Sequence, residues 1–195
     1  MAKLHREDLY SLEKYAEIRN EFRAKVMAEK QVRRVALGEH AALYFESALT
    51  MQYQVQEMLR IERIFEAAGI QEELDVYNPL IPDGSNWKAT FMLEYPDVAE
   101  RKAALAQLVG IEQRTYVQIE GHERVYAISN EDLDRTTDEK TSAVHFMRFE
   151  LTPAMVAAAH AGSAICCGID HPHYSAETTL SAAVQQSLCG DLVAV

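Results

Sequence analysis

The first part of the chain carries apolar residues at helical spacing. Those that recur every three or four positions are Leu12, Tyr15, Ile18, Phe22 and Val26. This period predicts one amphipathic helix over residues 8–32. A second helix is predicted over residues 51–68, with Thr50 as its N-cap and Gly69 as its end. Residues 70–77 read as a short helical continuation.

Residues 87–95 alternate strictly between apolar and polar side chains, with Trp87, Phe91 and Tyr95 on the apolar side. A period of two predicts a half-buried β-strand. Gly121-His122 predicts a tight hairpin between two further strands. The other strand-like segments are 35–45, which Gly38 interrupts, 115–120, 123–128, 143–151 and 164–169.

Capping residues predict the remaining helices. The predicted start and end points are Asp97 and Gly110, Thr152-Pro153 and Gly162, and Ser181 and Leu192. Residues 78–86 read as a loop, and residues 132–142 as a polar and mobile segment. Strands outnumber β–α–β patterns and a hairpin is present. We therefore predict an α+β fold, mainly an antiparallel sheet with helices packed against it, as a single domain over residues 1–195.

Charge changes this picture by excluding some partners. The net charge is −11, and residues 1–34 carry nine Lys/Arg against six Asp/Glu. The rest of the chain is therefore strongly acidic, which disfavours nucleic acid and anionic membranes as partners. We interpret the basic segment, Arg19 to Arg34, as a solvated helix face, with a basic docking arm as the alternative.

The three cysteines indicate a reducing compartment. Cys166 and Cys167 are adjacent, and with Cys189 the total is odd, so no disulfide framework is suggested. The charged N-terminal segment does not resemble a secretory signal, and no stretch approaches the roughly 18 apolar residues of a membrane helix. We expect a cytoplasmic protein, in which Cys166 and Cys167 stay reduced and point to opposite sides of a strand.

Glu62 is the residue that stands out on the helix predicted over residues 51–68. It falls in the middle of an apolar face made by Met51, Val55, Met58, Leu59, Ile61 and Phe65. A carboxylate there is costly unless it is paired, liganded or protonated. We therefore expect Glu62 to be largely buried. Its function is then that of a metal ligand or proton-transfer group, or else it forms an internal salt bridge.

The opposite side of this helix is polar. It carries Gln52, Gln56, Arg60 and Arg63. Arg60 and Arg63 are candidates for gripping an anion. The alternative is an exposed face with local ion pairs.

Two further segments carry candidate chemistry. His145 shares the apolar face of the strand over residues 143–151, as a metal or acid–base candidate or as a hydrogen-bonded core residue. Asp170-His171-Pro172-His173-Tyr174 follows a predicted strand and offers acidic, imidazole and phenol groups. We expect any metal or catalytic site to join the helix over residues 51–68 to the loop over residues 170–174. Such nitrogen and oxygen ligands suit iron, manganese or zinc.

Signatures of dinucleotide-binding proteins, P-loop nucleotidases, serine hydrolases and zinc proteases are absent from the sequence. Four longer runs resemble an uncharacterised bacterial family, domain of unknown function 3501. They are residues 50–63 (TMQYQVQEMLRIER), 77–84 (YNPLIPDG), 140–146 (KTSAVHF) and 168–172 (GIDHP). The resemblance implies a bacterial cytosolic protein whose gene often lies beside those of a rubrerythrin and an iron–sulfur oxidoreductase. The runs include Glu57, Glu62, Lys140, His145, Asp170 and His171.

Three functional hypotheses follow. The first is a cytosolic accessory protein of a peroxide-reducing, iron-dependent system, acting through contacts with rubrerythrin or the iron–sulfur oxidoreductase. The second is a metal-dependent or acid–base enzyme built from Glu62, His145 and the loop over residues 170–174. The third is a small-anion binder that uses Arg60 and Arg63. Convergence of the six residues of the four runs would favour the enzyme, and scattered positions would favour an interaction module.

Overall fold

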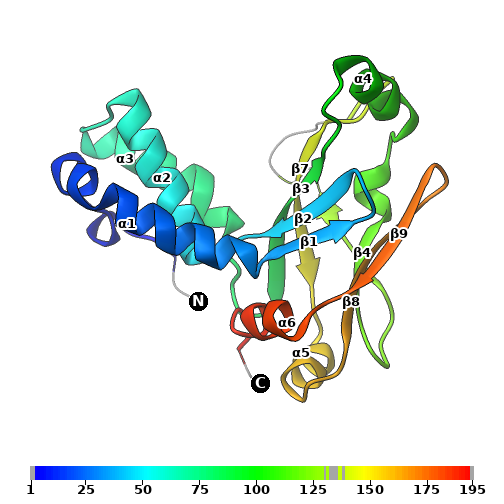
Figure 1. Cartoon of the computed structure of the whole chain (residues 1–195). Helices are drawn as coiled ribbons and strands as arrows, with labels where there is room; N and C mark the ends of the chain where they lie inside the picture. The colour runs from blue at the N-terminus through cyan, green and yellow to red at the C-terminus, as the bar shows by residue number, and fades with distance from the viewer. Residues whose placement is uncertain (1–2, 130, 132–135, 138, 194–195) are drawn as a thin grey trace.

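The computed structural model describes residues 3–129, 131, 136–137 and 139–193, and it has two parts (Figure 1). A helical arm projects from a body built on two antiparallel β-sheets. The arm comprises η1 (Arg6–Asp8), α1 (Leu12–Gln31), α2 (Ala48–Glu62), α3 (Ala67–Tyr77) and η2 (Asn78–Leu80). The other helices of the described residues are α4 (Val98–Gln107), η3 (Ile111–Arg114), α5 (Pro153–His160) and α6 (Ala182–Cys189).

Among the described residues, the first sheet has five strands in the order β1-β2-β3-β7-β6, and the second has four in the order β5-β4-β8-β9. The strands of the first sheet are β1 (Arg34–Leu37), β2 (Ala41–Phe45), β3 (Asn86–Leu93), β7 (Val144–Glu150) and β6 (Ile128–Ser129). Those of the second are β5 (Val125–Tyr126), β4 (Thr115–Ile119), β8 (Ile165–His171) and β9 (Tyr174–Thr179). All pairings are antiparallel. The predicted α+β class is confirmed, but two facing sheets replace the single sheet expected.

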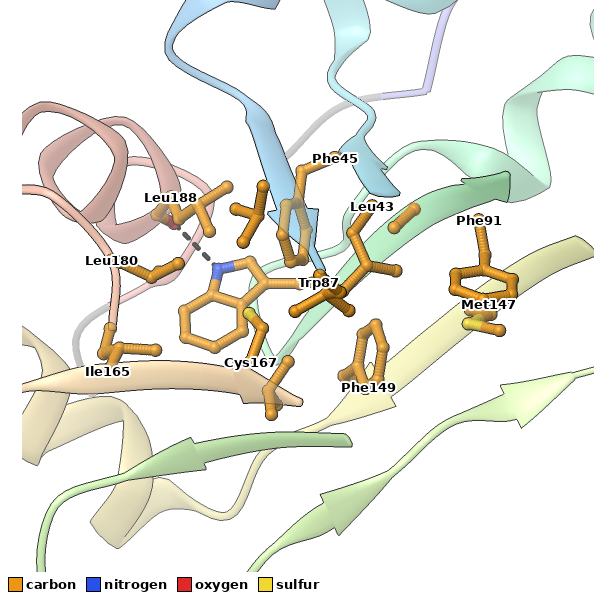
Figure 2. Close-up of a cluster of buried hydrophobic side chains, with 14 of the residues drawn as sticks. Leu43, Phe45, Trp87, Phe91, Met147, Phe149, Ile165, Cys167, Leu180 and Leu188 are labelled. Atoms are coloured by element: carbon orange, nitrogen blue, oxygen red, sulfur yellow. Dashed lines mark hydrogen bonds between the residues drawn. The ribbon is translucent and has the colours of Figure 1, made fainter. Parts of the chain in front are cut away.

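The core lies between the two sheets. Inward residues of β2, β3 and β7 meet those of β4 and β8, because side chains alternate between the faces of each strand. Trp87 is fully buried at the centre, and its indole N–H donates to the Leu188 carbonyl oxygen over 2.9 Å (Figure 2). Helices α5 and α6 close one end of the sandwich, and α4 lies at the other (Figure 1).

One seam between the sheets is closed by side chains. Strand β1 pairs with β2 alone among the described strands, and β9 pairs with β8 alone. The Tyr174 hydroxyl donates to the Leu37 carbonyl oxygen over 2.6 Å, and the Thr178 hydroxyl donates to that of Ala36 over 2.8 Å. Gly38 has φ +74°, and a Cβ there would lie 2.7 Å from the Tyr174 hydroxyl oxygen. The seam therefore requires glycine at this turn.

The arm has its own small cores. Tyr15, Phe22 and Val26 of α1 pack against α2, and Met51, Val55 and Leu59 of α2 pack against α3 and the N-terminal segment. This pattern confirms the predicted amphipathic first helix, which begins at Leu12 with Ser11 as its cap and not at residue 8.

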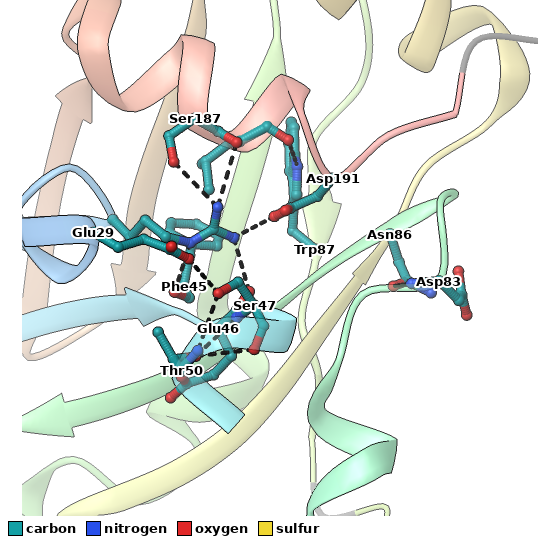
Figure 3. A network of polar contacts seen from close by, with 12 residues as sticks. Glu29, Phe45, Glu46, Ser47, Thr50, Asp83, Asn86, Trp87, Ser187 and Asp191 are labelled. Carbon is teal, nitrogen blue, oxygen red and sulfur yellow. Dashed lines mark hydrogen bonds and ion pairs between the residues drawn. The ribbon is translucent and has the colours of Figure 1, made fainter. Parts of the chain in front are cut away.

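The arm is joined to the body through a buried arginine. Arg33 donates to the carbonyl oxygens of Phe45 and Glu46, to Ser187 on α6, and to the Asp191 carboxylate. Figure 3 shows Ser187 and Asp191 opposite the segment from Phe45 to Thr50. Burial raises the pKa of Asp191, while the Arg33 charge opposes that rise. The buried pair thus joins the C-terminal helix to the start of the arm.

Several predicted boundaries are wrong. Ser47, not Thr50, caps α2, and Gly69 lies inside α3, because the chain turns at Arg63 in the left-handed conformation. Strand β9 was not predicted, since its outward residues are polar. The expectation of a mobile segment over residues 132–142 falls partly outside the described residues, at 132–135 and 138. That the chain is one domain stays a prediction.

In the part of the chain that the structure describes, no helix combines the length and apolar character needed to cross a bilayer.

The Arg33 network generates the first prediction. Replacing Arg33 by Met leaves Asp191 buried without its cation and two carbonyl oxygens without donors, so the free energy of unfolding should fall by about 3–5 kcal/mol. Urea denaturation followed by circular dichroism measures this. The double variant Arg33→Met/Asp191→Leu should recover part of the loss, because it removes the uncompensated charge. The matched exposed variant Arg23→Met should stay within about 0.5 kcal/mol of the parent. A loss of less than about 1 kcal/mol for Arg33→Met would contradict the assigned role.

Candidate functional site

Glu62 is exposed, so the prediction that it points into the core is wrong. It is the last residue of α2 and lies one turn beyond Leu59, the last buried residue of the apolar stripe. Ile61 and Phe65, which the pattern assigned to the core, are 62% and 60% exposed. The apolar stripe of α2 therefore extends beyond the elements that pack against it, and its last residues are exposed.

Glu57 clamps α1 to α2. One carboxylate oxygen accepts from the Tyr15 hydroxyl and from Arg19 Nε, both over 2.8 Å, and the other accepts from Arg19 over 2.9 Å and from Arg60 over 3.2 Å. These hydrogen bonds, those of Arg19 first, lower the pKa of Glu57 to about 2. Glu57 therefore acts in this structure as an anchor between two helices.

The polar face expected to grip an anion does not form. Gln56 is fully buried, where its amide bonds to the main-chain N–H and carbonyl oxygen of Tyr10 over 2.6 and 3.3 Å. Arg60 is engaged by Glu57, and Arg63 is an exposed helix cap with φ 56°. The alternative interpretation, local pairing on the surface, describes Arg60.

His145 is a hydrogen-bonded core residue. Its Nε2 lies 2.9 Å from Thr141 Oγ1 and 3.1 Å from the Ser142 carbonyl oxygen. The Thr141 hydroxyl donates to fully buried Glu112 over 3.2 Å, and Glu112 lies 3.9 Å from His145 Nε2. Sequence analysis missed Glu112, because a four-residue 3-10 helix after a glycine leaves no periodic signal.

The segment over residues 170–174 is not a loop as predicted: it spans the end of β8, a turn at Pro172 and His173, and the start of β9, and its side chains diverge. Asp170 points outward, where it lies 2.8 Å from Arg114 and 3.1 Å from Arg124 and accepts from the Tyr126 hydroxyl over 2.6 Å. His171 is buried with Nε2 3.1 Å from the Val109 carbonyl oxygen. Asp170 on the outer face, His171 beside Val109 and Tyr174 at the seam with β1 therefore lie in three different environments.

The six residues of the family-like runs do not converge. Glu57 and Glu62 belong to the arm, which lies away from the β8–β9 hairpin in Figure 1, whereas His145 lies between the sheets. Lys140 is exposed. Within the described ranges, no three His, Cys, Asp or Glu side chains are placed to hold a metal ion. The structure therefore does not assemble the site expected from Glu62, His145, Asp170 and His171.

Cys166 and Cys167 diverge across β8 as predicted. Both are free thiols, Cys167 in the core and Cys166 half-buried on the outer side. Burial raises the pKa of each thiol, which disfavours the reactive thiolate.

The outer face of the second sheet carries an ordered group of side chains. We call it the tyrosine–arginine face; it consists of Arg114, Tyr116, Arg124, Tyr126, Asp170 and Glu177. The Arg124 guanidinium lies 4.1 Å from the Tyr116 ring centre, a cation–π contact. The Tyr116 hydroxyl donates to Glu177 over 2.6 Å. Burial, together with this carboxylate, raises the pKa of Tyr116.

The backbone of β8 leaves room for the Tyr116 ring of this face. Gly168 lies under Tyr116, and a Cβ there would come within 2.4 Å of the ring. Sequence analysis missed the face, although an Arg-x-Tyr pattern leads into each strand of the hairpin, at residues 114–116 and 124–126, with Arg114 ending η3 and Arg124 just before β5. Alternation places both residues of each pattern on one side of the sheet.

Glu57 generates a prediction about pH. Because its pKa in the folded protein lies near 2, below the ordinary 4.5, the anchor stabilises the fold above pH 4.5. That contribution is lost as the pH falls toward about 2. Glu57→Gln should therefore be less stable than the parent at pH 7, and the difference should narrow over this range. Urea midpoints measured at several pH values test this, with exposed Glu17→Gln as the control. A difference independent of pH would exclude the linkage.

A crystal structure of a novel protein of unknown function from Burkholderia pseudomallei K96243, at 1.90 Å resolution, has a TM-score of 0.93 and 50% sequence identity, covering 98% of this chain and 100% of that one. The comparison with curated proteins finds no match. The family described as protein of unknown function (DUF3501) matches residues 3–192. The chain therefore belongs to the DUF3501 family.

Proposed function

We propose that this protein is an accessory protein of a peroxide-reducing, iron-dependent system, and that it binds its partner through the tyrosine–arginine face. The observation that carries the proposal is the ordered group of two arginines, two tyrosines and two carboxylates on an otherwise open sheet face. Tyr and Arg, together with Trp, are the residues most enriched among the energetic anchors of protein interfaces. The partners proposed are rubrerythrin and the iron–sulfur oxidoreductase.

Preorganisation supports this use of the face. Arg114 and Arg124 are each held by Asp170, and Arg124 is stacked on Tyr116, so little side-chain freedom is left to lose on binding. Tyr126 is 39% exposed, which leaves much of its ring available to a partner. A rigid anchor of this kind costs less entropy than a flexible surface residue.

Charge also favours docking at this face. The chain carries −11, which repels an acidic partner over most of its surface. On the tyrosine–arginine face two guanidinium groups balance Asp170 and Glu177, so the local sum is zero. An acidic protein partner therefore meets less repulsion here than over the acidic remainder of the body.

Binding measurements test the proposal. Biolayer interferometry with purified rubrerythrin and purified iron–sulfur oxidoreductase of the same organism should detect binding to one of them. Tyr126→Ala should weaken that affinity at least about tenfold, as truncation of an interface anchor does. Tyr10→Ala is the matched control, since Tyr10 is also 39% exposed but lies on the arm. Circular dichroism verifies that each variant is folded.

Two outcomes would overturn parts of this proposal. If neither protein binds, the partner assignment is wrong. If one binds but Tyr10→Ala weakens it while Tyr126→Ala does not, the contact surface is the arm and not the tyrosine–arginine face.

A further inference from the structure

A pocket of about 480 Å³ lies between the arm and the outer face of the five-stranded sheet. The strand register shows which side chains form the floor of the pocket. Tyr44, Thr90 and Phe146 form one row across β2, β3 and β7, and Met92 and Val144 belong to the next row. Side chains of the arm form the roof: Lys30, Met51, Gln54, Tyr77 and Leu80. The volume is within the roughly 300–1,000 Å³ typical of small-molecule sites.

Glu46 presents a buried carboxylate to this pocket. The residue is 8% exposed, and its two oxygens accept from the hydroxyls of Thr50 over 2.7 Å and Thr90 over 2.6 Å. No Lys, Arg or His nitrogen of the described residues lies within 4.0 Å of it. A carboxylate accepts about four hydrogen bonds, so Glu46 retains acceptor capacity that a cationic group can use.

Lys30 presents the opposite charge to the same pocket. It is half-buried at the last turn of α1, and the described residues place no carboxylate within 4.0 Å of its ammonium group. Lys30 and Glu46 therefore line one pocket without pairing with each other. A ligand that carries both charges can satisfy both groups at once.

Most of the remaining lining is apolar. Met51, Leu80, Met92, Val144 and Phe146 contribute most of the surface that a ligand body would contact. Thioether side chains adapt to ligands of differing shape. The lining thus favours a ligand with an apolar body between two charged ends.

We propose that this pocket binds a small zwitterion with an apolar side chain, of the amino acid or dipeptide class. The ligand ammonium group bonds to Glu46, its carboxylate bonds to Lys30, and its side chain packs on Met92 and Phe146. The inference stands apart from the proposed partner contact, because it uses the first sheet and not the tyrosine–arginine face.

Isothermal titration calorimetry at pH 7 tests the ligand class with matched probes. L-Phenylalanine, L-leucine and leucyl-leucine are the zwitterions. 2-Phenylethylamine and 3-phenylpropionate each keep the ring of phenylalanine and lack one charge. At least one zwitterion should bind. If L-phenylalanine binds, both single-charge probes should bind at least tenfold more weakly than it does. If leucine or leucyl-leucine binds instead, the single-charge probes are isopentylamine and 4-methylpentanoate, which keep the leucine side chain and lack one charge.

Variants test the location of the site. Glu46→Gln and Lys30→Gln should each weaken zwitterion binding at least tenfold, and Lys25→Gln, an exposed change on the same helix, should leave it unchanged. Should Glu46→Gln fail to fold by circular dichroism, Lys30→Gln decides, because within the described residues the Lys30 side chain forms no hydrogen bond or ion pair that the fold would lose. The proposal is overturned if no zwitterion binds at millimolar concentration, if a single-charge probe binds as tightly, or if the folded variants bind like the parent.

Discussion

The buried Arg33 guanidinium is the interaction on which the rest of the structure depends. It bonds to the carbonyl oxygens at the end of β2, to Ser187 and to Asp191, and so links three parts of the chain that are far apart in sequence. A lysine would offer a point charge, whereas the planar fork of arginine supplies five donors in fixed directions. The same residue that accepts from Arg33 through its main chain, Glu46, directs its carboxylate into the pocket beneath the arm. The buried network therefore fixes the chain where the arm joins the body, directly beside the pocket.

Most of the charged groups that looked chemically useful are engaged in holding elements together. Glu57 binds Tyr15 and Arg19 between two helices, and Asp170 binds two arginines across the second sheet. Such groups already have their hydrogen bonds, so another ligand would have to replace bonds within the protein. Glu46 and Lys30 differ, because each lines a pocket with bonding capacity left. This difference, and not the residue type, separates an anchor from a candidate binding group.

How far the sequence predicted this structure depends on the range of the forces involved. The alternation of residues 87–95 identified β3, and the caps at Asp97 and Ser181 located α4 and α6, since these signals lie within a few residues of each other. Glu62 was misplaced because periodicity describes a helix face and says nothing of where the covering elements stop. The pairing of Glu112 with Thr141 and His145 also depends on distant segments, so no local pattern reveals it. Strand β9 has little apolar character because the exposed edge of a sheet needs little.

The arrangement of the two sheets separates the two proposed activities. The pocket lies on the outer face of the first sheet, and the tyrosine–arginine face is the outer face of the second. The packed core around Trp87 lies between them, so a ligand in the pocket touches no residue of the tyrosine–arginine face. Any influence of one on the other has to pass through this core, through the seam where Tyr174 and Thr178 bond to β1, or along the chain from β5 to β6, which joins the two sheets at the other edge. Close-packed cores resist gradual deformation, whereas a seam held by two hydroxyl groups has far fewer bonds to break. The seam is held by side-chain hydrogen bonds, whereas the chain itself joins the sheets at the β5–β6 edge, so we expect the seam to be the edge that separates more readily.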